Sequence, residues 1–332
     1  MISSVHAVIA GKTYDTGFHV TTPSAFWVQK YMREAADHGD THMILEVTSH
    51  GISQFRVWGI RFALGVITNV TREHLDWHGT FEQYIRSKLS LLKRSAIPIV
   101  NRDEEFLYNR AVDLVGRKSL ITYGIHKPAV VTSVTHPFTT RLPGEFNRYN
   151  CLAALAAAHA LGISKRTAGK AIAAFSGLTG RMETVAVKPF RVIVDFAHTP
   201  NAIEQVLRSV RETTQRHIIH VFGSAGLRDK GKRPLMGTAS ARYADVIILT
   251  EEDYRTENVH DIIGQIAQGI PKGKKIHAYP DREKAIRYAL HIAETGDTVI
   301  ITGKGHERSL CRGLKEIPWS DQGLVKKILL QE

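Results

Sequence analysis

The sequence predicts an α/β protein with two domains, each built on a mostly parallel sheet. The chain has 332 residues, more than a single hydrophobic core usually serves and enough for two domains of ordinary size. Beyond about residue 183, short apolar runs alternate regularly with helix-length segments, which is typical of a doubly wound sheet. Before that point the apolar runs are spaced less regularly. We therefore expect one domain over residues 1–183 and a second over residues 184–332.

In the first domain, apolar runs and helical spacing predict the following elements. Strands are expected to end at Glu46, Asn69 and Asn101, and helices to cover residues 81–94, 150–161 and 164–175. Residues 102–140 are interpreted as an irregular or β-rich insert, with candidate strands at 121–123 and 129–132.

The second domain has a simpler pattern of strands and helices in strict alternation. Strands are expected at residues 191–196, 217–222, 245–250, 275–279 and 297–302, and helices at about 200–213, 233–243, 259–269, 281–293 and 321–330.

Composition excludes several classes of protein. Hydrophobic content of 43% and charged content of 23% are ordinary for a soluble globular protein, and no apolar run reaches the roughly 18 residues of a membrane span. The first residues do not read as a signal peptide, and two cysteines imply no disulfide framework, so a cytoplasmic location is expected.

The formal net charge of +12 comes from scattered basic residues. Nucleic-acid binding favours a dense basic stripe with interleaved aromatic side chains, so no nucleic-acid partner is expected. The one tight cluster, Arg228-Asp-Lys-Gly-Lys-Arg233, lies in a glycine-rich turn. That placement favours a polyanionic small molecule as the partner.

Three polar residues of the first domain stand where a metal-phosphate site is expected. Glu46 closes an apolar strand, His74 follows the next strand, and Lys88 lies one helix later. Ligands gather at the carboxyl ends of strands in open α/β sheets, and a carboxylate there commonly holds Mg²⁺. Each residue also has an ordinary structural explanation: an acid at the edge of the core, a residue at a helix start, and a lysine that extends its charge into water.

Three segments of the second domain follow adjacent predicted strands. They are Asp195-Phe-Ala-His198, the glycine-rich turn Gly223–Asp229, and Gly303-Lys-Gly-His-Glu307. Glycine-rich turns expose backbone N–H groups that bind anions. Each segment alone is a weak signal, but three on one edge of a sheet predict a binding site.

A phosphate-binding P-loop is absent from the sequence. Gly11-Lys12-Thr13 resembles the end of such a loop, but its first glycine would fall at His6, and the residues that follow do not predict a helix. A β-hairpin turn is the expected structure there.

Taken together, the motifs resemble those of the Mur ligases. They occur in the order of the family and span nearly the whole chain: Glu46-Val-Thr-Ser-His50, Gln54-Phe-Arg56, Thr68-Asn-Val-Thr-Arg-Glu-His-Leu-Asp-Trp-His-Gly79, Gly180-Arg-Met-Glu183, Asp195-Phe-Ala-His-Thr-Pro200, Gly226-Leu-Arg-Asp-Lys-Gly-Lys-Arg-Pro234 and Gly303-Lys-Gly-His-Glu307. The resemblance implies a truncated central ATPase domain followed by a Rossmann-like ligase domain.

Within the family, the resemblance is to members that add the third peptide residue in peptidoglycan biosynthesis. It implies ATP- and Mg²⁺-dependent amide bond formation between meso-diaminopimelate and UDP-N-acetylmuramoyl-L-alanyl-D-glutamate, through an acyl phosphate. Under this resemblance Glu46, His74 and Lys88 (as a carbamate) are the catalytic and metal-binding residues; Asn150, Arg181, Asp195 and His198 contact the nucleotide; Thr21, Thr22, Ser49, Gln54 and Arg56 hold the muramoyl-dipeptide; and Arg228, Asp253, Arg255, Gly303 and Glu307 form the pocket of the incoming amino acid.

The sequence departs from the family pattern in its amino-acid pocket. Members that use diaminopimelate have Asp-Asn-Pro-Arg where this chain has Glu252-Asp-Tyr-Arg255. The retained arginine favours a ligand with a distal carboxylate, because a guanidinium clamps that group with two hydrogen bonds. The extra charge of Asp253 would instead suit the distal ammonium of L-lysine.

The second departure is the missing P-loop, since the chain starts beyond the family's UDP-binding domain and P-loop strand. Little in it would hold the β- and γ-phosphates. The alternatives are an incomplete reading frame, a separate polypeptide that carries the P-loop, or a non-catalytic binding module. A related ligase for folate or a polyamide remains a further alternative.

Overall fold

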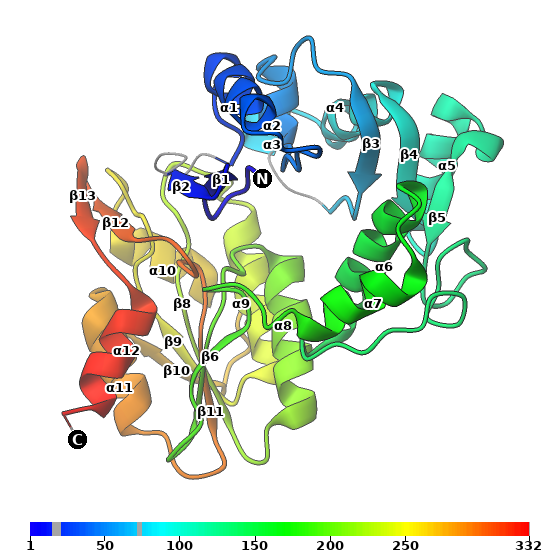
Figure 1. Ribbon diagram of the computed structural model, residues 1–332. Coiled ribbons are helices and arrows are strands. Elements are labelled where there is room, and N and C mark those ends of the chain that lie inside the picture. The colour runs from blue at the N-terminus through cyan, green and yellow to red at the C-terminus, as the bar shows by residue number, and fades with distance from the viewer. Residues whose placement is uncertain (15–20, 72–74, 332) are drawn as a thin grey trace. The chain divides into compact units, whose positions relative to one another are not determined.

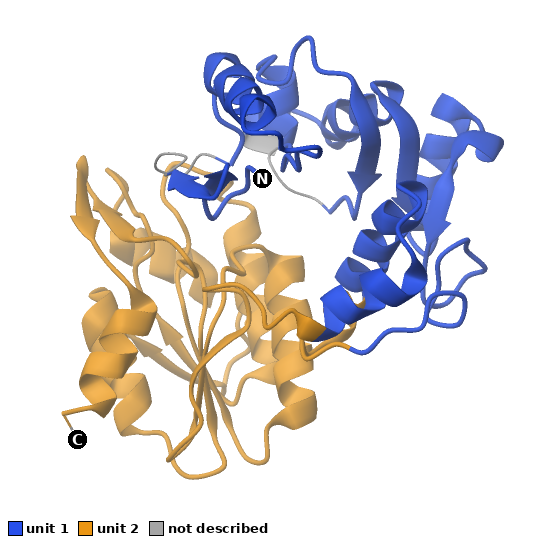
Figure 2. Cartoon of the chain, viewed as in Figure 1, with its two compact units in different colours: residues 1–139, 149–173 blue, residues 140–148, 174–332 orange. Residues whose placement is uncertain are grey.

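The computed structural model describes residues 1–14, 21–71 and 75–331 (Figure 1). The chain forms two compact units (Figure 2). Unit 1 comprises residues 1–139 and 149–173, and unit 2 comprises residues 140–148 and 174–332. The chain therefore passes between the units more than once, first through the short segment 140–148.

Unit 1 contains a three-stranded parallel sheet in the order β3-β4-β5. Its strands are β3 (Phe62–Ile67), β4 (Ser95–Asn101) and β5 (Ile121–Tyr123), and the helices beside it are α4 (Phe81–Lys93), α5 (Glu105–Val115), α6 (Glu145–Ala160) and α7 (Lys165–Ala174). Consecutive residues of β4 point to opposite faces of the sheet. Val100 packs with α4 and α5, whereas Ile99 packs with α6. The predicted sheet and the helix over residues 81–94 are confirmed.

A β-hairpin and a group of helices complete unit 1. They are β1 (Ala7–Ile9), β2 (Lys12–Tyr14), α1 (Ala25–Asp37), α2 (Ser49–Ser53), α3 (Leu75–His78) and the single 3₁₀ turn η1 (Arg117–Ser119). The hairpin turns at Ala10 and Gly11, which both have positive φ, as a two-residue hairpin turn requires. The hairpin expected at Gly11-Lys12-Thr13 is therefore confirmed.

Three expectations for unit 1 are wrong. The strand expected to end at Glu46 is reduced to one bridge, between Leu45 and Ile2, because its partner segment turns away at Ser3. The candidate strand at 129–132 is likewise one bridge, from Val131 to Tyr123. The segment read as irregular or β-rich contains helix α5, whose buried Leu107 and Ala111 lie one turn apart.

Unit 2 contains a six-stranded sheet in the order β10-β9-β8-β11-β7-β6. All neighbouring strands are parallel except the edge pair β6–β7. Its elements are β6 (Glu183–Ala186), β7 (Arg191–Val194), α8 (Pro200–Thr213), β8 (Ile218–Phe222), α9 (Lys232–Tyr243), β9 (Val246–Leu249), α10 (Val259–Ala267), β10 (Lys275–Ala278), α11 (Arg282–His291), β11 (Thr298–Ile301), the hairpin β12 (Ser309–Arg312) and β13 (Lys315–Pro318), and α12 (Asp321–Leu329).

Helices cover both faces of this sheet (Figure 1). Helices α8, α9 and α10 pack on one face, where Ile193 and Ile300 lie, and α11 and α12 pack on the other, where Val192 and Ile301 lie. Because both faces are buried, β9 is a continuous apolar run, and β8 is one except for His220. The doubly wound fold is confirmed. None of the helices in the described ranges is long and apolar enough to span a membrane.

Candidate active site

The three segments that the sequence placed on one edge of the second sheet do lie together in unit 2. They follow the carboxyl ends of β7, β8 and β11, and these strands are direct neighbours in the order β8-β11-β7. Loops at this edge of a parallel sheet form the usual ligand crevice of doubly wound folds. We call this edge the rim.

Asp195 fixes the connection that enters β6 at the rim. Its carboxylate, 6% exposed, accepts hydrogen bonds from the backbone N–H groups of Met182 (2.7 Å) and Ala197 (2.7 Å). Burial raises the pKa of Asp195, although these two donors act in the opposite direction. The guanidinium of Arg181 packs over the ring of Phe196 at 4.5 Å. The structure therefore brings Asp195 and Arg181 together, as expected.

His198 lies beside these residues, at the start of helix α8. Its Nδ1 is 2.9 Å from the carbonyl oxygen of Phe196, and its own carbonyl accepts a hydrogen bond from Lys232 (2.9 Å). The adjacent Thr199 caps the helix by accepting from the N–H of Ala202. The cap and the lysine together hold His198 at the rim.

Two glycines allow the rim segments to approach closely. A Cβ on Gly180 would lie 2.1 Å from the backbone nitrogen of His306, and a Cβ on Gly305 would lie 2.6 Å from Cβ of Phe196. Both glycines have positive φ. Only glycine combines that backbone conformation with so close an approach. The contact holds the segment Gly180–Glu183 against the loop that follows β11.

A buried ion network lies under the amino-acid pocket expected from the sequence. The ammonium of Lys304 is fully buried, 2.9 Å from Asp253 and 2.5 Å from Glu307. Burial alone would lower its pKa, but the carboxylates of Glu307 and Asp253 outweigh that effect and raise it. Asp253 also accepts from the N–H of Cys311 (2.8 Å), and Gly303 lies next to the side chain of Glu252. Asp253, Gly303 and Glu307 are thus brought together.

Arg255 belongs to the same group, through the turn after β8. Its Nη1 donates to the carbonyl oxygen of Gly226, two residues before the exposed Arg228. The turn is held by Glu257, which accepts from the N–H of Leu227 and binds Arg233 through both carboxylate oxygens (2.7 and 2.9 Å). The hydrogen bonds from Arg233 lower the pKa of Glu257 to about 2.

The basic cluster Arg228–Arg233 has a different role from the one its charge indicated. Arg233 is fully buried, Lys230 pairs with Glu257 at 3.2 Å, and Lys232 binds the carbonyl of His198. These contacts position the turn, so most of the cluster is engaged within the protein. Arg228 is exposed at the rim.

In unit 1, Thr22 organises the group expected to hold the muramoyl-dipeptide. Its hydroxyl donates to the carbonyl of Glu46 (2.9 Å) and accepts from the N–H of Thr48 (3.1 Å), and its carbonyl accepts from Arg56. Arg56 in turn donates to the Gln54 side chain (2.8 Å). Thr21 directly precedes Thr22 in the chain. Thr22, Gln54 and Arg56 therefore form one hydrogen-bonded group.

The expected metal-binding residues are only partly described. His74 lies outside the described residues. The carboxylate of Glu46 is exposed and accepts hydrogen bonds from the backbone N–H (2.7 Å) and the hydroxyl of Ser4. Lys88 is half-buried, with its ammonium 3.4 Å from the carbonyl of Asn69 and 4.8 Å from the centre of the Tyr84 ring.

An unsatisfied oxygen lies close to this group. Ser49 is 2% exposed, and its hydroxyl has no hydrogen-bond partner among the described residues. Its carbonyl accepts from Ser87, the residue before Lys88 (3.1 Å). A carboxylate and a hydroxyl are the hard oxygen donors that Mg²⁺ prefers, so the chemistry of Glu46 and Ser49 fits such an ion. In the described ranges, no three His, Cys, Asp or Glu side chains form a metal-binding group.

Several residues that matter to the rim were not expected from the sequence. Lys304 and Arg233 organise it from fully buried positions, and Glu257 from a partly buried one. The sequence signal for Lys304 is its position between Gly303 and Gly305 in a short loop, although this position alone does not show whether the side chain is buried. Nothing in the sequence signals that Arg233 pairs with Glu257, 24 residues later. Asn150 lies on α6 in unit 1, exposed, whereas Arg181, Asp195 and His198 lie in unit 2.

Comparison with known proteins decides the family. The model of the Mur ligase middle domain matches residues 1–158, and that of the Mur ligase glutamate ligase domain matches residues 180–305. A curated UDP-N-acetylmuramyl-tripeptide synthetase from Roseiflexus sp. is 37% identical over all of this chain and 73% of its own length. The chain belongs to the Mur ligase family.

Further relatives agree with this assignment. The UDP-N-acetylmuramoyl-L-alanyl-D-glutamate–2,6-diaminopimelate ligase of Alkaliphilus metalliredigens is 36% identical over 94% of this Mur ligase and 68% of its own length. A solved structure of a UDP-N-acetylmuramoyl-L-alanyl-D-glutamate–2,6-diaminopimelate ligase is 30% identical, with a TM-score of 0.58, over 94% of this chain and 69% of the solved one. The chain thus spans about 70% of the length of these relatives.

Proposed function

We propose that this Mur ligase carries the acceptor site and much of the nucleotide site of an enzyme that joins meso-diaminopimelate to UDP-N-acetylmuramoyl-L-alanyl-D-glutamate. The observation that carries the proposal is the rim of unit 2. There the family segments after β7, β8 and β11 are neighbours, in a chain about 36% identical to ligases named for this reaction. The P-loop that ATP requires would come from outside these 332 residues, on the same or a separate polypeptide.

In the proposed reaction the substrate carboxylate takes the γ-phosphoryl group of ATP, which releases ADP and forms an acyl phosphate. The amine of the diamino acid then attacks the acyl carbon, forms the amide bond and expels inorganic phosphate. Asn150, Arg181, Asp195 and His198 would contact the nucleotide, whereas Thr21, Thr22, Ser49, Gln54 and Arg56 would hold the muramoyl-dipeptide.

A divalent cation, which we propose to be Mg²⁺, would be held by Glu46, His74 and Lys88 in its carbamate form. The ion would neutralise charge on the phosphates. An ammonium would repel the ion, whereas a carbamate offers anionic oxygens, so the role of Lys88 depends on its modification. Lys88 directly follows Ser87, whose hydroxyl donates to the carbonyl of Ser49, and this proximity to the Ser49 segment supports the assignment.

Diaminopimelate is favoured over L-lysine by the surroundings of Asp253. That carboxylate is 2% exposed and is already engaged inside the protein by the N–H of Cys311 and by Lys304, which it shares with Glu307. It therefore supplies little attraction for a distal ammonium. Arg255, half-buried beside it, keeps guanidinium N–H groups for a distal carboxylate. Arg228, Gly303 and Glu307 would complete this pocket.

The proposal is tested by ADP release from the chain supplemented with the P-loop-bearing N-terminal portion of a related ligase. Diaminopimelate, L-lysine and L-glutamate are compared as acceptors. We expect turnover with diaminopimelate and a loss of at least 100-fold in Lys88→Ala. The matched control is Lys93→Ala on the same helix, which should retain activity. Unchanged turnover in Lys88→Ala would remove the metal-carbamate role.

The second candidate is a binding module without ligase activity. It predicts that calorimetry detects diaminopimelate binding while no ADP is released, whichever N-terminal portion is added. Turnover with L-glutamate alone would instead favour a ligase of the folate or polyamide type.

A further inference from the structure

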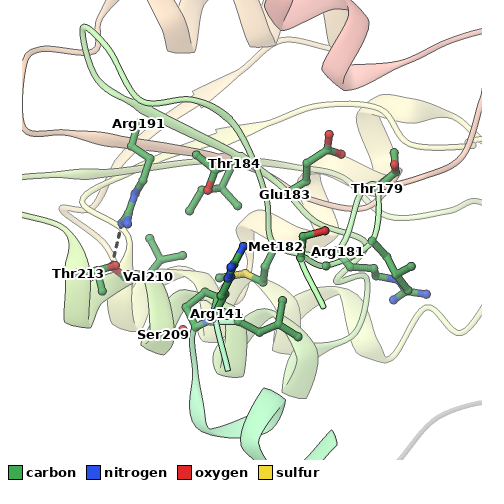
Figure 3. A pocket seen from close by; sticks show the side chains of 16 residues that line it. Arg141, Thr179, Arg181, Met182, Glu183, Thr184, Arg191, Ser209, Val210 and Thr213 are labelled. Atoms are coloured by element: carbon green, nitrogen blue, oxygen red, sulfur yellow. Dashed lines mark hydrogen bonds between the residues drawn. The ribbon is translucent and has the colours of Figure 1, made fainter. Parts of the chain in front are cut away.

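A cavity of about 390 Å³ opens in unit 2, and its lining includes three residues of the motif Gly180–Glu183 together with residues outside the family motifs (Figure 3). Its walls come from residues 141–143, residues 176–184, the start of β7 and the last turns of α8. Two of these walls belong to the stretches of chain that connect the two units. The volume is in the range of small-molecule sites.

The charge in this cavity comes from two arginines. Arg191 projects from β7, half-buried, and its hydrogen bonds run to the hydroxyls of Thr298 (3.2 Å) and Thr214 (3.1 Å) and to the carbonyl of Val210. None of its contacts within the described ranges is a carboxylate. A partly buried guanidinium without an acidic partner is costly, and an anionic ligand would remove that cost.

The second arginine, Arg141, enters from the connecting segment (Figure 3). Its side chain is exposed, and it has no hydrogen bond or ion pair in the part of the chain that the structure describes. The third arginine of the lining, Arg181, directs its guanidinium onto the ring of Phe196 at the rim. Arg141 and Arg191 are therefore the cations available to a ligand here.

A buried hydroxyl adds a third donor. Ser209 of α8 lines the cavity and is 4% exposed, and its Oγ has no hydrogen-bond partner among the described residues. An unsatisfied buried hydroxyl is destabilising, and a hydrogen bond to a ligand oxygen would remove that cost. The acid of the lining, Glu183, is already engaged by the N–H of Gly180 (2.8 Å) and by Gln322 (3.1 Å).

We propose that this cavity binds a small organic phosphate, with its anionic group between Arg141 and Arg191. A phosphate monoester offers three acceptor oxygens, which match two guanidinium groups and one hydroxyl, whereas a carboxylate offers two. The rest of the ligand packs on the buried apolar side chains Met182, Ile193 and Val210. The bound phosphate would tie the connecting segment at Arg141 to strand β7. This site is independent of the proposed ligase activity.

The test uses the complete chain with phenyl phosphate as the probe, and titration calorimetry as the measurement. Phenol and inorganic phosphate serve as the comparison ligands. We expect saturable binding of phenyl phosphate, weaker binding of inorganic phosphate and none of phenol. Arg141→Ala should weaken phenyl phosphate binding at least tenfold, and Ser209→Ala several-fold.

The matched control is Arg242→Ala, which removes one exposed positive charge from α9 of the same unit, where it pairs with Glu204. Its binding should equal that of the unsubstituted chain. Equal weakening in Arg141→Ala and Arg242→Ala would reduce the effect to overall charge and overturn the proposal. Displacement of phenyl phosphate by ADP together with unchanged binding in Arg141→Ala would place the ligand at the rim and would overturn the proposal as well, as would the absence of binding.

Discussion

At the scale of single residues, several polar side chains buried in unit 2 are satisfied by hydrogen bonds to other buried groups. His220 is an example in the middle of β8. It is fully buried, with Nδ1 2.8 Å from the Ser240 hydroxyl and Nε2 3.0 Å from the Thr302 hydroxyl. Burial, and secondarily the charge of Arg282, lowers the pKa of His220 to about 3. The imidazole is therefore neutral in the folded protein over a pH range in which it is charged in the unfolded chain.

This difference predicts acid sensitivity. The unfolded chain takes up a proton at His220 below its ordinary pKa of about 6.5, whereas the folded protein does not until about pH 3. Folding stability is therefore full above pH 6.5 and falls as the pH decreases towards 3, by about 1.4 kcal/mol per pH unit from this group. Denaturant unfolding at pH 7, 6 and 5 should show the fall in the unsubstituted chain.

His220→Leu should reduce that dependence by the same amount, although it also lowers stability at pH 7 by leaving two hydroxyls unsatisfied. The matched control is His260→Gln, because His260 is exposed on α10 and loses little hydration on folding. Its pH dependence should equal that of the unsubstituted chain. An unchanged slope in His220→Leu would assign the acid sensitivity to other groups.

At the scale of elements, a buried ion pair joins the starts of two helices. Arg282 begins α11 and Asp321 begins α12, both are fully buried, and two hydrogen bonds of 2.9 and 2.7 Å connect them. Arg282 also donates to the carbonyls of Glu251 and Thr302, which follow β9 and β11. One side chain thus ties two helices to two strand ends.

Removal of this arginine should therefore be severe. Arg282→Met leaves Asp321 buried without its cation, which we expect to cost about 3–5 kcal/mol of unfolding free energy. Arg287→Met, on the same helix, breaks an exposed pair with Glu283 and should cost at most about 0.5 kcal/mol. The double variant Arg282→Met with Asp321→Asn should recover part of the loss. If chemical denaturation showed the same loss of unfolding free energy for Arg282→Met and Arg287→Met, this account would be contradicted.

Comparison of elements shows which parts of the fold the sequence determines locally. Five strands and five helices of unit 2 were predicted to within a few residues, because most of these strands are short apolar runs and several of these helices begin at a capping residue such as Thr199 or Asn258. The edge strand β6 and the hairpin β12–β13 were not predicted. The strand expected at Glu46 failed for a different reason. Its formation depends on a partner strand, which is not encoded in its own residues.

The same distinction applies to the candidate site. The three rim loops were predictable, since parallel strands carry their loops to one edge. The engagement of Asp253 by Lys304 and of Arg233 by Glu257 was not, because those pairs join residues 51 and 24 positions apart. Charge alone made both Asp253 and Arg233 look like ligand-binding groups, and only tertiary packing reveals that Asp253 is paired with Lys304 and Arg233 with Glu257.

At the scale of the whole molecule, the charge of +12 is distributed rather than concentrated. Many arginines in the described ranges are paired with carboxylates, for example Arg211 with Asp245 and Arg216 with Glu294. Paired cations release few counterions from a nucleic acid, so they contribute little to its binding.

We therefore predict no saturable binding of duplex or single-stranded DNA at about 0.15 M salt. Fluorescence anisotropy with labelled 20-mers measures this directly. Weak binding that appears only at low salt would be consistent with the overall charge. Saturable binding that persists at 0.3 M salt would show that the scattered basic residues form a coherent surface after all.

The close contact between Gly180 and the loop of Gly305 also has a genetic consequence. Every amino acid other than glycine that a single base change can produce from a glycine codon carries a Cβ. At position 180 that atom would lie 2.1 Å from the backbone nitrogen of His306, which cannot move aside as the end of a flexible side chain could. A compensating change at position 305 is excluded too, because residue 305 already has the smallest side chain. No pair of substitutions at these two positions restores the fit. Both glycines therefore have to be retained if this contact is to form.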